Sequence, residues 1–202
     1  MTAYQPVANG RAPGSIPAHA DVHGPPLPRA TLPAMGAMDD LADRLDTGVE
    51  AMVELGPQLA AGEPWAMAGQ VGPGPESSWG PREVLAHVGE MLPFWLGEIE
   101  RILDASDGPE PLAFGRLEAD DLRVAIITRD REFPARELLG RVEAEGRRVA
   151  RRFRAFGDAE AVAVGRHPTR GDLTVRDIAE RLIVGHLEGH VTQLRETVGA
   201  SR

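Results

Sequence analysis

Apolar side chains recur every three or four residues along four long segments of this 202-residue chain, which is the period of an amphipathic α-helix. The segments cover about residues 38–61, 81–105, 134–156 and 174–198, and a shorter one covers residues 118–129. Loops rich in Pro and Gly separate them, and only residues 161–164 could form a short extended stretch. The pattern therefore predicts an all-α protein whose architecture is a four-helix bundle.

Two of the expected helix starts carry capping signals. Thr174 and Asp177, three residues apart, form the pattern of a capping box, in which each side chain bonds the backbone N–H of the other residue. Gly80 and Glu83 have the same spacing before the second long helix, with glycine in place of the usual serine or threonine. These signals predict helix starts near residues 81 and 174.

Composition bounds the number of domains and the class of partner. Residues 1–37 are rich in Pro, Gly and Ala, so we expect a disordered tail followed by one domain over residues 38–202. The net charge of −9 argues against a nucleic-acid partner, and the absence of cysteine excludes disulfides and a thiol nucleophile from the chain itself. No apolar run reaches the ~20 residues of a membrane span and no signal peptide is evident, so we expect no membrane partner and a cytoplasmic location.

The last expected helix carries two histidines four residues apart, His186 and His190. They continue the apolar stripe of Ile178 and Leu182, so both imidazoles should leave the same face of the helix and point into the core. Two inward imidazoles need a partner, because an unpartnered buried polar group costs roughly a few kcal/mol. A divalent metal ion is one such partner, since neutral imidazole is its commonest protein ligand.

His87 is a third candidate ligand, on an apolar face of the second long helix. It lies roughly 10 Å from the start of that helix, and His190 lies roughly 12 Å before the end of the last one. If the two helices run antiparallel, His87, His186 and His190 converge at one level of the bundle. Three imidazoles are the minimum set for a zinc-type site with an open coordination position. Core histidines that merely hydrogen-bond their neighbours are the alternative interpretation.

The same measure of depth sorts the other polar candidates. His167 lies more than about 20 Å along the axis from His186, so we expect a loop histidine near the opposite end of the bundle. Glu90, one turn after His87, could be a fourth ligand or could hydrogen-bond a ligand, and an exposed carboxylate is equally compatible. Glu188 does not directly follow the first histidine, so it should point away and does not form the zinc-protease pattern.

Over about residues 38–198 the sequence resembles the DinB-like superfamily of metal-binding four-helix bundles. The matching motifs are WGPREVLAH over residues 79–87, HPTRG over residues 167–171, TVRD over residues 174–177 and GHLEGH over residues 185–190. Members bind a divalent metal through one histidine of the second helix and two of the last, so the resemblance implies His87, His186 and His190 as the ligands. Gly80 departs from the serine or threonine that is frequent there, which affects helix capping rather than the metal.

The superfamily includes mycothiol- and bacillithiol-dependent S-transferases and maleylpyruvate isomerase-like proteins, and many members have no known activity. The resemblance implies a cofactor such as zinc, nickel, iron or manganese, which would lower the pKa of a low-molecular-weight thiol and make it the nucleophile. The absence of cysteine does not favour this chemistry over hydrolysis by a metal-bound hydroxide. Our leading hypothesis is a metal-dependent thiol S-transferase or related enzyme that acts on a small molecule and forms a homodimer. The alternative is a non-catalytic helical bundle that serves as a dimeric or partner-binding module. The sequence assigns no catalytic and no thiol-binding residue.

Overall fold

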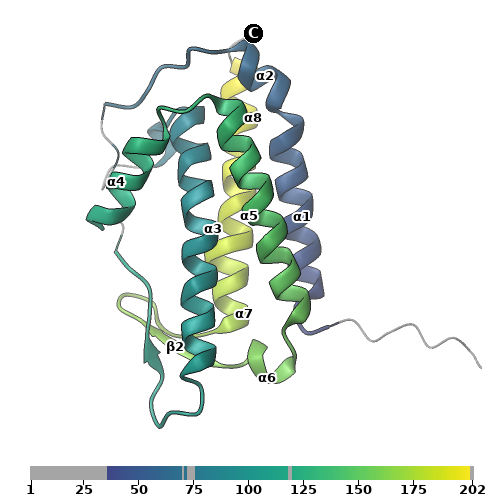
Figure 1. Cartoon of the computed structure of the whole chain (residues 1–202), viewed down its shortest axis with the longest axis vertical. Helices are drawn as coiled ribbons and strands as arrows, with labels where there is room; N and C mark the ends of the chain where they lie inside the picture. Colours follow the sequence, from purple (N-terminus) through teal and green to yellow (C-terminus); the bar gives the residue numbers. More distant parts are fainter. Residues whose placement is uncertain (1–35, 70, 72–75, 118–119, 201–202) are drawn as a thin grey trace, which may run out of the picture. The chain divides into compact units, whose positions relative to one another are not determined.

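The structure, a computed structural model, describes residues 36–69, 71, 76–117 and 120–200 (Figure 1). Of the tail expected over residues 1–37, residues 1–35 lie outside the described residues. The described part of the chain is mostly helical, as predicted, but it also carries a small three-stranded sheet that the sequence did not predict. Within these ranges, no helix combines the length and the apolar character needed to cross a membrane.

The helices lie close to the predicted segments. The long ones are α1 (Asp39–Glu54), α3 (Pro81–Asp104), α5 (Ala135–Ala155) and α8 (Gly185–Ala200). The shorter ones are α2 (Gly56–Ala61), α4 (Asp121–Asp130), α6 (Asp158–Ala161) and α7 (Val175–Ile178), with a 3-10 turn η1 (Glu76–Ser78) and a π-helical turn η2 (Ala179–Val184). The strands are β1 (Leu112–Ala113), β2 (Val164–His167) and β3 (Gly171–Thr174).

The four long helices run side by side along the longest axis (Figure 1). α1 packs against α5 and α8, and α3 packs against the same two helices. Their apolar faces meet in one core, with Leu45, Leu85, Val142 and Leu187 all at 0 % exposure. α3 and α8 run in opposite directions, which is the arrangement that brings the middle of one to the level of the middle of the other (Figure 1).

The first predicted helix is divided in two near Leu55. Pro57 has no N–H to donate to the carbonyl of Val53, so the ladder of α1 cannot continue through it. The chain turns at Leu55, whose N–H bonds the Met52 carbonyl at 3.1 Å. α2 then begins with Pro57 in its first turn, where a proline is tolerated.

The last predicted helix begins as expected but contains a π-helical turn. The N–H of Asp177 donates to Oγ1 of Thr174 at 3.0 Å and the N–H of Thr174 donates to the Asp177 carboxylate at 3.2 Å, which completes the capping box. Further along, the N–H of Gly185 bonds the carbonyl of Glu180, five residues back. A Cβ at Gly185 would lie only 3.1 Å from that carbonyl oxygen, so glycine suits this turn. The turn ends at Val184, two residues before His186.

The extended stretch predicted over residues 161–164 was misplaced. Ala161 ends α6, and β2 begins only at Val164. β2 is antiparallel to β3, with His167 opposite Gly171, and parallel to β1, with Gly165 opposite Leu112. The strands have two or four residues each, too few to show the alternation by which a strand is recognised in a sequence.

α1 and α5 approach closely at Gly146. A Cβ there would lie 2.4 Å from Cγ2 of Val49 on α1, and Val49 is 3 % exposed and β-branched, so it has little freedom to turn away. We expect Gly146→Ala to lower the free energy of unfolding by about 1–2 kcal/mol, because overpacking outweighs the gain of about 1 kcal/mol in helix propensity.

Gly140→Ala is the matched control on the same helix, since no atom lies within 4 Å of its added Cβ. It should raise the free energy of unfolding by about 0.5–1 kcal/mol. Denaturant unfolding of both variants measures the two changes, and a shift of the same sign in both would contradict the close approach of α1 and α5.

Candidate metal centre

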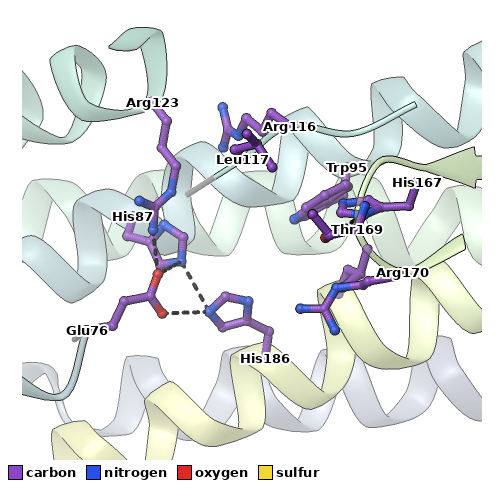
Figure 2. A pocket seen from close by; sticks show the side chains of 11 residues that line it. Glu76, His87, Trp95, Arg116, Leu117, Arg123, His167, Thr169, Arg170 and His186 are labelled. Carbon is purple, nitrogen blue, oxygen red and sulfur yellow. Dashed lines mark hydrogen bonds and ion pairs between the residues drawn. The ribbon is translucent and has the colours of Figure 1, made fainter. Parts of the chain in front are cut away.

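Four side chains with metal-binding atoms meet between η1, α3 and α8. They are Glu76 from η1, His87 from α3, and His186 and His190 from α8. One ligand atom of each lies within 4.8 Å of those of the other three. The structure thus brings together the three histidines that the sequence singled out, and it adds a carboxylate. Figure 2 shows Glu76, His87 and His186 turned toward one another.

The antiparallel course of α3 and α8 sets the positions of the imidazoles. The rings of His186 and His190, one turn apart on α8, stack with their centroids 4.7 Å apart. The His87 ring approaches both of them from α3, with centroid distances of 5.0 Å to His186 and 5.1 Å to His190. The three rings therefore surround one point between the two helices.

Four distances between the candidate ligand atoms are close to those expected around a single ion. Atoms bound at about 2.0–2.1 Å to a tetrahedral metal lie roughly 3.3 Å from one another. Nε2 of His186 is 3.3 Å from Nε2 of His87 and 3.1 Å from Oε2 of Glu76. Nε2 of His190 is 3.6 Å from Oε2 of Glu76, and Nε2 of His87 is 3.7 Å from Oε1. These residues fit a divalent metal ion.

His190 gives a second sign that the residues fit a metal. Its Nδ1 lies 3.0 Å from Oε1 of Gln193, and because an amide oxygen can only accept, Nδ1 carries the proton. Its Nε2 therefore holds a lone pair, and this buried atom has no hydrogen-bond partner among the described residues. A buried acceptor left without a partner is costly, and a metal ion would supply that partner.

The electrostatics keep the ligands in their metal-binding states. Burial lowers the pKa of His190 to about 4, and repulsion from His186 adds to this effect. Burial also lowers the pKa of His87, again with the help of the neighbouring imidazoles. Burial acts to raise the pKa of Glu76, but the hydrogen bond from His186 and nearby positive charge outweigh it and lower that pKa. At pH 7 the two buried imidazoles are neutral and the carboxylate is ionised.

Two further residues hold the ligands in place. Besides orienting His190, Gln193 donates from Nε2 to the carbonyl of Glu76 at 2.8 Å and to that of Trp79 at 3.3 Å. It therefore ties the segment that carries Glu76 to α8. Arg123 of α4 pairs with Oε1 of Glu76 from the other side. Partners of this kind fix the orientation of a ligand and tune its basicity.

The carboxylate of the cluster is not the one that the sequence suggested. Glu90 pairs with Arg116 at 2.5 Å and does not belong to the cluster. Glu76 takes that place from a 3-10 turn within a Gly- and Pro-rich loop, whose path no periodic pattern describes. The one available signal was its position shortly before the helix that carries His87. Glu188 points away as expected, to Arg44 at 2.8 Å.

The prediction that His186 is buried was wrong, since its side chain is 31 % exposed whereas that of His190 is 5 % exposed. His167 is also not the remote loop residue that its axial distance suggested. It is the last residue of β2, it is 6 % exposed, and it lines the same pocket as His186. The sheet returns His167 toward α3, where its ring contacts the ring of Trp95 at a centroid distance of 6.2 Å. It lies outside the cluster of four ligands.

Gly80 caps α3 in an extended conformation, but Glu83 does not complete the predicted capping box. Oε1 of Glu83 instead accepts from the N–H of Ala68 at 2.7 Å and from Arg131 at 3.2 Å. A Cβ at Gly80 would lie 2.6 Å from the carbonyl oxygen of Ala66. The loop before α3 therefore requires glycine at residue 80, a helix-capping position where serine or threonine is more usual.

The cluster faces a pocket of about 400 Å³ that is lined by His87, His186 and Glu76 at one end (Figure 2). A small molecule in this pocket would reach the ligand atoms directly. No protein-family model matches the chain, and neither a curated protein nor a solved structure does. The function is therefore argued from the site itself.

Proposed function

We propose that this protein binds a divalent metal ion through Glu76, His87, His186 and His190. The convergence of the four candidate ligand atoms within 4.8 Å of one another, together with the unpartnered Nε2 of His190, is the observation that carries the proposal. Imidazole ligands suit zinc, nickel and iron, and a carboxylate also suits manganese. Neutral imidazoles and an ionised carboxylate are the states that such ions bind.

The reaction that we propose for this site is thiol S-transfer or a related conversion of a small molecule. A bound ion would supply Lewis acidity, which lowers the pKa of a thiol that reaches it through the pocket. The chain has no cysteine, so the thiol must come from a low-molecular-weight compound such as mycothiol or bacillithiol. The protein's own part is to hold the ligands, through Gln193 and Arg123, and to leave one side of the cluster open to the pocket.

The packing of α1, α3, α5 and the continuous run from α7 to α8 supports our proposal of a DinB-like four-helix bundle. The resemblance of the sequence to the DinB-like superfamily also supports the proposal that His87, His186 and His190 are ligands. The homodimer and the cytoplasmic location stay predictions from the sequence.

Elemental analysis of protein purified without a metal-affinity tag tests the metal site. We expect about one zinc, nickel, iron or manganese ion per chain, and a rise in melting temperature when that ion is returned to chelator-treated protein. Neither bound metal nor stabilisation by any of the four ions would favour the non-catalytic bundle with hydrogen-bonded histidines. If metal is present, assays with mycothiol and bacillithiol test the reaction.

A further inference from the structure

Arg170 gives the pocket a positive charge that no carboxylate of the described residues neutralises, and in Figure 2 its guanidinium lies between His167 and His186. Three arginines line the pocket. Arg116 pairs with Glu90 and Arg123 pairs with Glu76, whereas the described residues place no carboxylate against the guanidinium of Arg170. In a chain with a net charge of −9, such a cation beside a proposed metal site favours an anionic ligand.

His167 and Thr169 lie next to Arg170 in this part of the pocket (Figure 2). Nδ1 of His167 accepts the backbone N–H of Thr169 at 3.2 Å, which leaves the proton of the neutral ring on Nε2. Burial and the charge of Arg170 lower the pKa of His167, so the ring is neutral at pH 7. No hydrogen bond between described residues uses its Nε2–H, which is therefore available as a donor.

Apolar side chains also line the pocket. They are Trp95, Leu117 and Leu182. Leu117 is 57 % exposed, and a ligand in the pocket would cover part of it. A ligand with an apolar body and one charged end matches this combination of positive charge and apolar lining.

We propose that the pocket binds a small organic carboxylate, whose carboxylate contacts Arg170 and His167, whose apolar body lies against Trp95 and Leu182, and whose other end faces the metal ligands. An arginine fork and one imidazole N–H suit the two oxygens of a carboxylate. A phosphate, with three oxygens and nearly two charges, would call for more donors than Arg170 and His167 offer. The choice of this molecule as the substrate rests on the proposed function, but its binding does not.

Calorimetric titration with benzoate, before and after removal of metal by phenanthroline and dialysis, tests the proposal. We expect benzoate to bind the wild-type protein in both forms and Arg170→Met to weaken it roughly 10–100-fold, because a charge-assisted pair is lost. Arg181→Met is the matched control: its side chain is 62 % exposed, it pairs with Asp177, and it does not line the pocket. The affinity of the Arg181→Met variant for benzoate should stay within about twofold of that of the wild type. Circular dichroism of both variants checks that they are folded.

Further ligands separate the outcomes. Benzyl alcohol, which keeps the ring but lacks the charge, should bind equally weakly to the wild type and to Arg170→Met. Inorganic phosphate that binds as tightly as benzoate would overturn the choice of a carboxylate, and equal loss in both arginine variants would overturn the subsite. Metal binding without any Arg170-dependent binding of benzoate refutes this inference alone. Arg170-dependent binding to a protein that takes up no metal would instead refute the proposed function and leave the subsite standing.

Discussion

Replacing His186 by alanine is expected to abolish tight metal binding while leaving the protein folded. The variant removes one of three imidazoles and a ligand atom that lies 3.1 Å from Glu76 and 3.3 Å from His87. The affinity for the ion should fall by more than the roughly 10–100-fold that loss of an outer partner costs. Because the side chain is 31 % exposed, the truncation opens no large cavity in the core. Metal titration with elemental analysis of the dialysed protein measures the loss.

His167→Ala is the control for this experiment, because His167 lines the same pocket but stands outside the four ligands. It should keep one ion per chain at nearly the wild-type affinity. If His167→Ala loses the ion as completely as His186→Ala does, the ligand set is wrong. If neither variant loses it, the ion is bound elsewhere in the chain.

The long helices and the meeting of three histidines could be predicted from the sequence, for a common physical reason. A helix of fixed rise and period converts sequence position into depth and direction, so the positions of His87 and His190 in the chain suffice to place them at one level. The argument needed only that α3 and α8 be antiparallel, as they are (Figure 1). The cap at Thr174 followed from local chemistry in the same way, whereas α3 begins at Pro81 as predicted although Glu83 does not form the capping box.

What could not be predicted depends on contacts between residues far apart in the chain. Glu76 joins the cluster because Gln193, over a hundred residues later, holds its carbonyl, and no local pattern encodes that bond. His167 reaches the pocket because β2 pairs with β1 across some fifty residues, which axial distance along one helix cannot describe. The π-helical turn before His186 depends on Gly185, whose N–H bonds a carbonyl five residues back instead of the usual four.

Replacing Glu83 by alanine is expected to cause the largest loss of stability. The Glu83 side chain is completely buried, and its Oε1 accepts from the N–H of Ala68 and from Arg131, whose side chain is 14 % exposed. The variant leaves a mostly buried guanidinium and a backbone N–H without this acceptor. Breaking a buried ion pair from one side costs about 3–5 kcal/mol, so the free energy of unfolding should fall by that amount. Denaturant unfolding with an unchanged m-value measures it.

Glu137→Ala is the matched control, because it removes an exposed i,i+4 ion pair with Arg141 and should cost less than about 1 kcal/mol. Equal losses in the two variants would contradict the buried role of Glu83. Folded Glu83→Ala should still bind one metal ion, since Glu83 holds Ala68 and Arg131 and contacts none of the four ligands through a hydrogen bond between described residues. Loss of the ion from protein that is still folded would mean that this buried pair also positions Glu76 or His87, one turn further along α3.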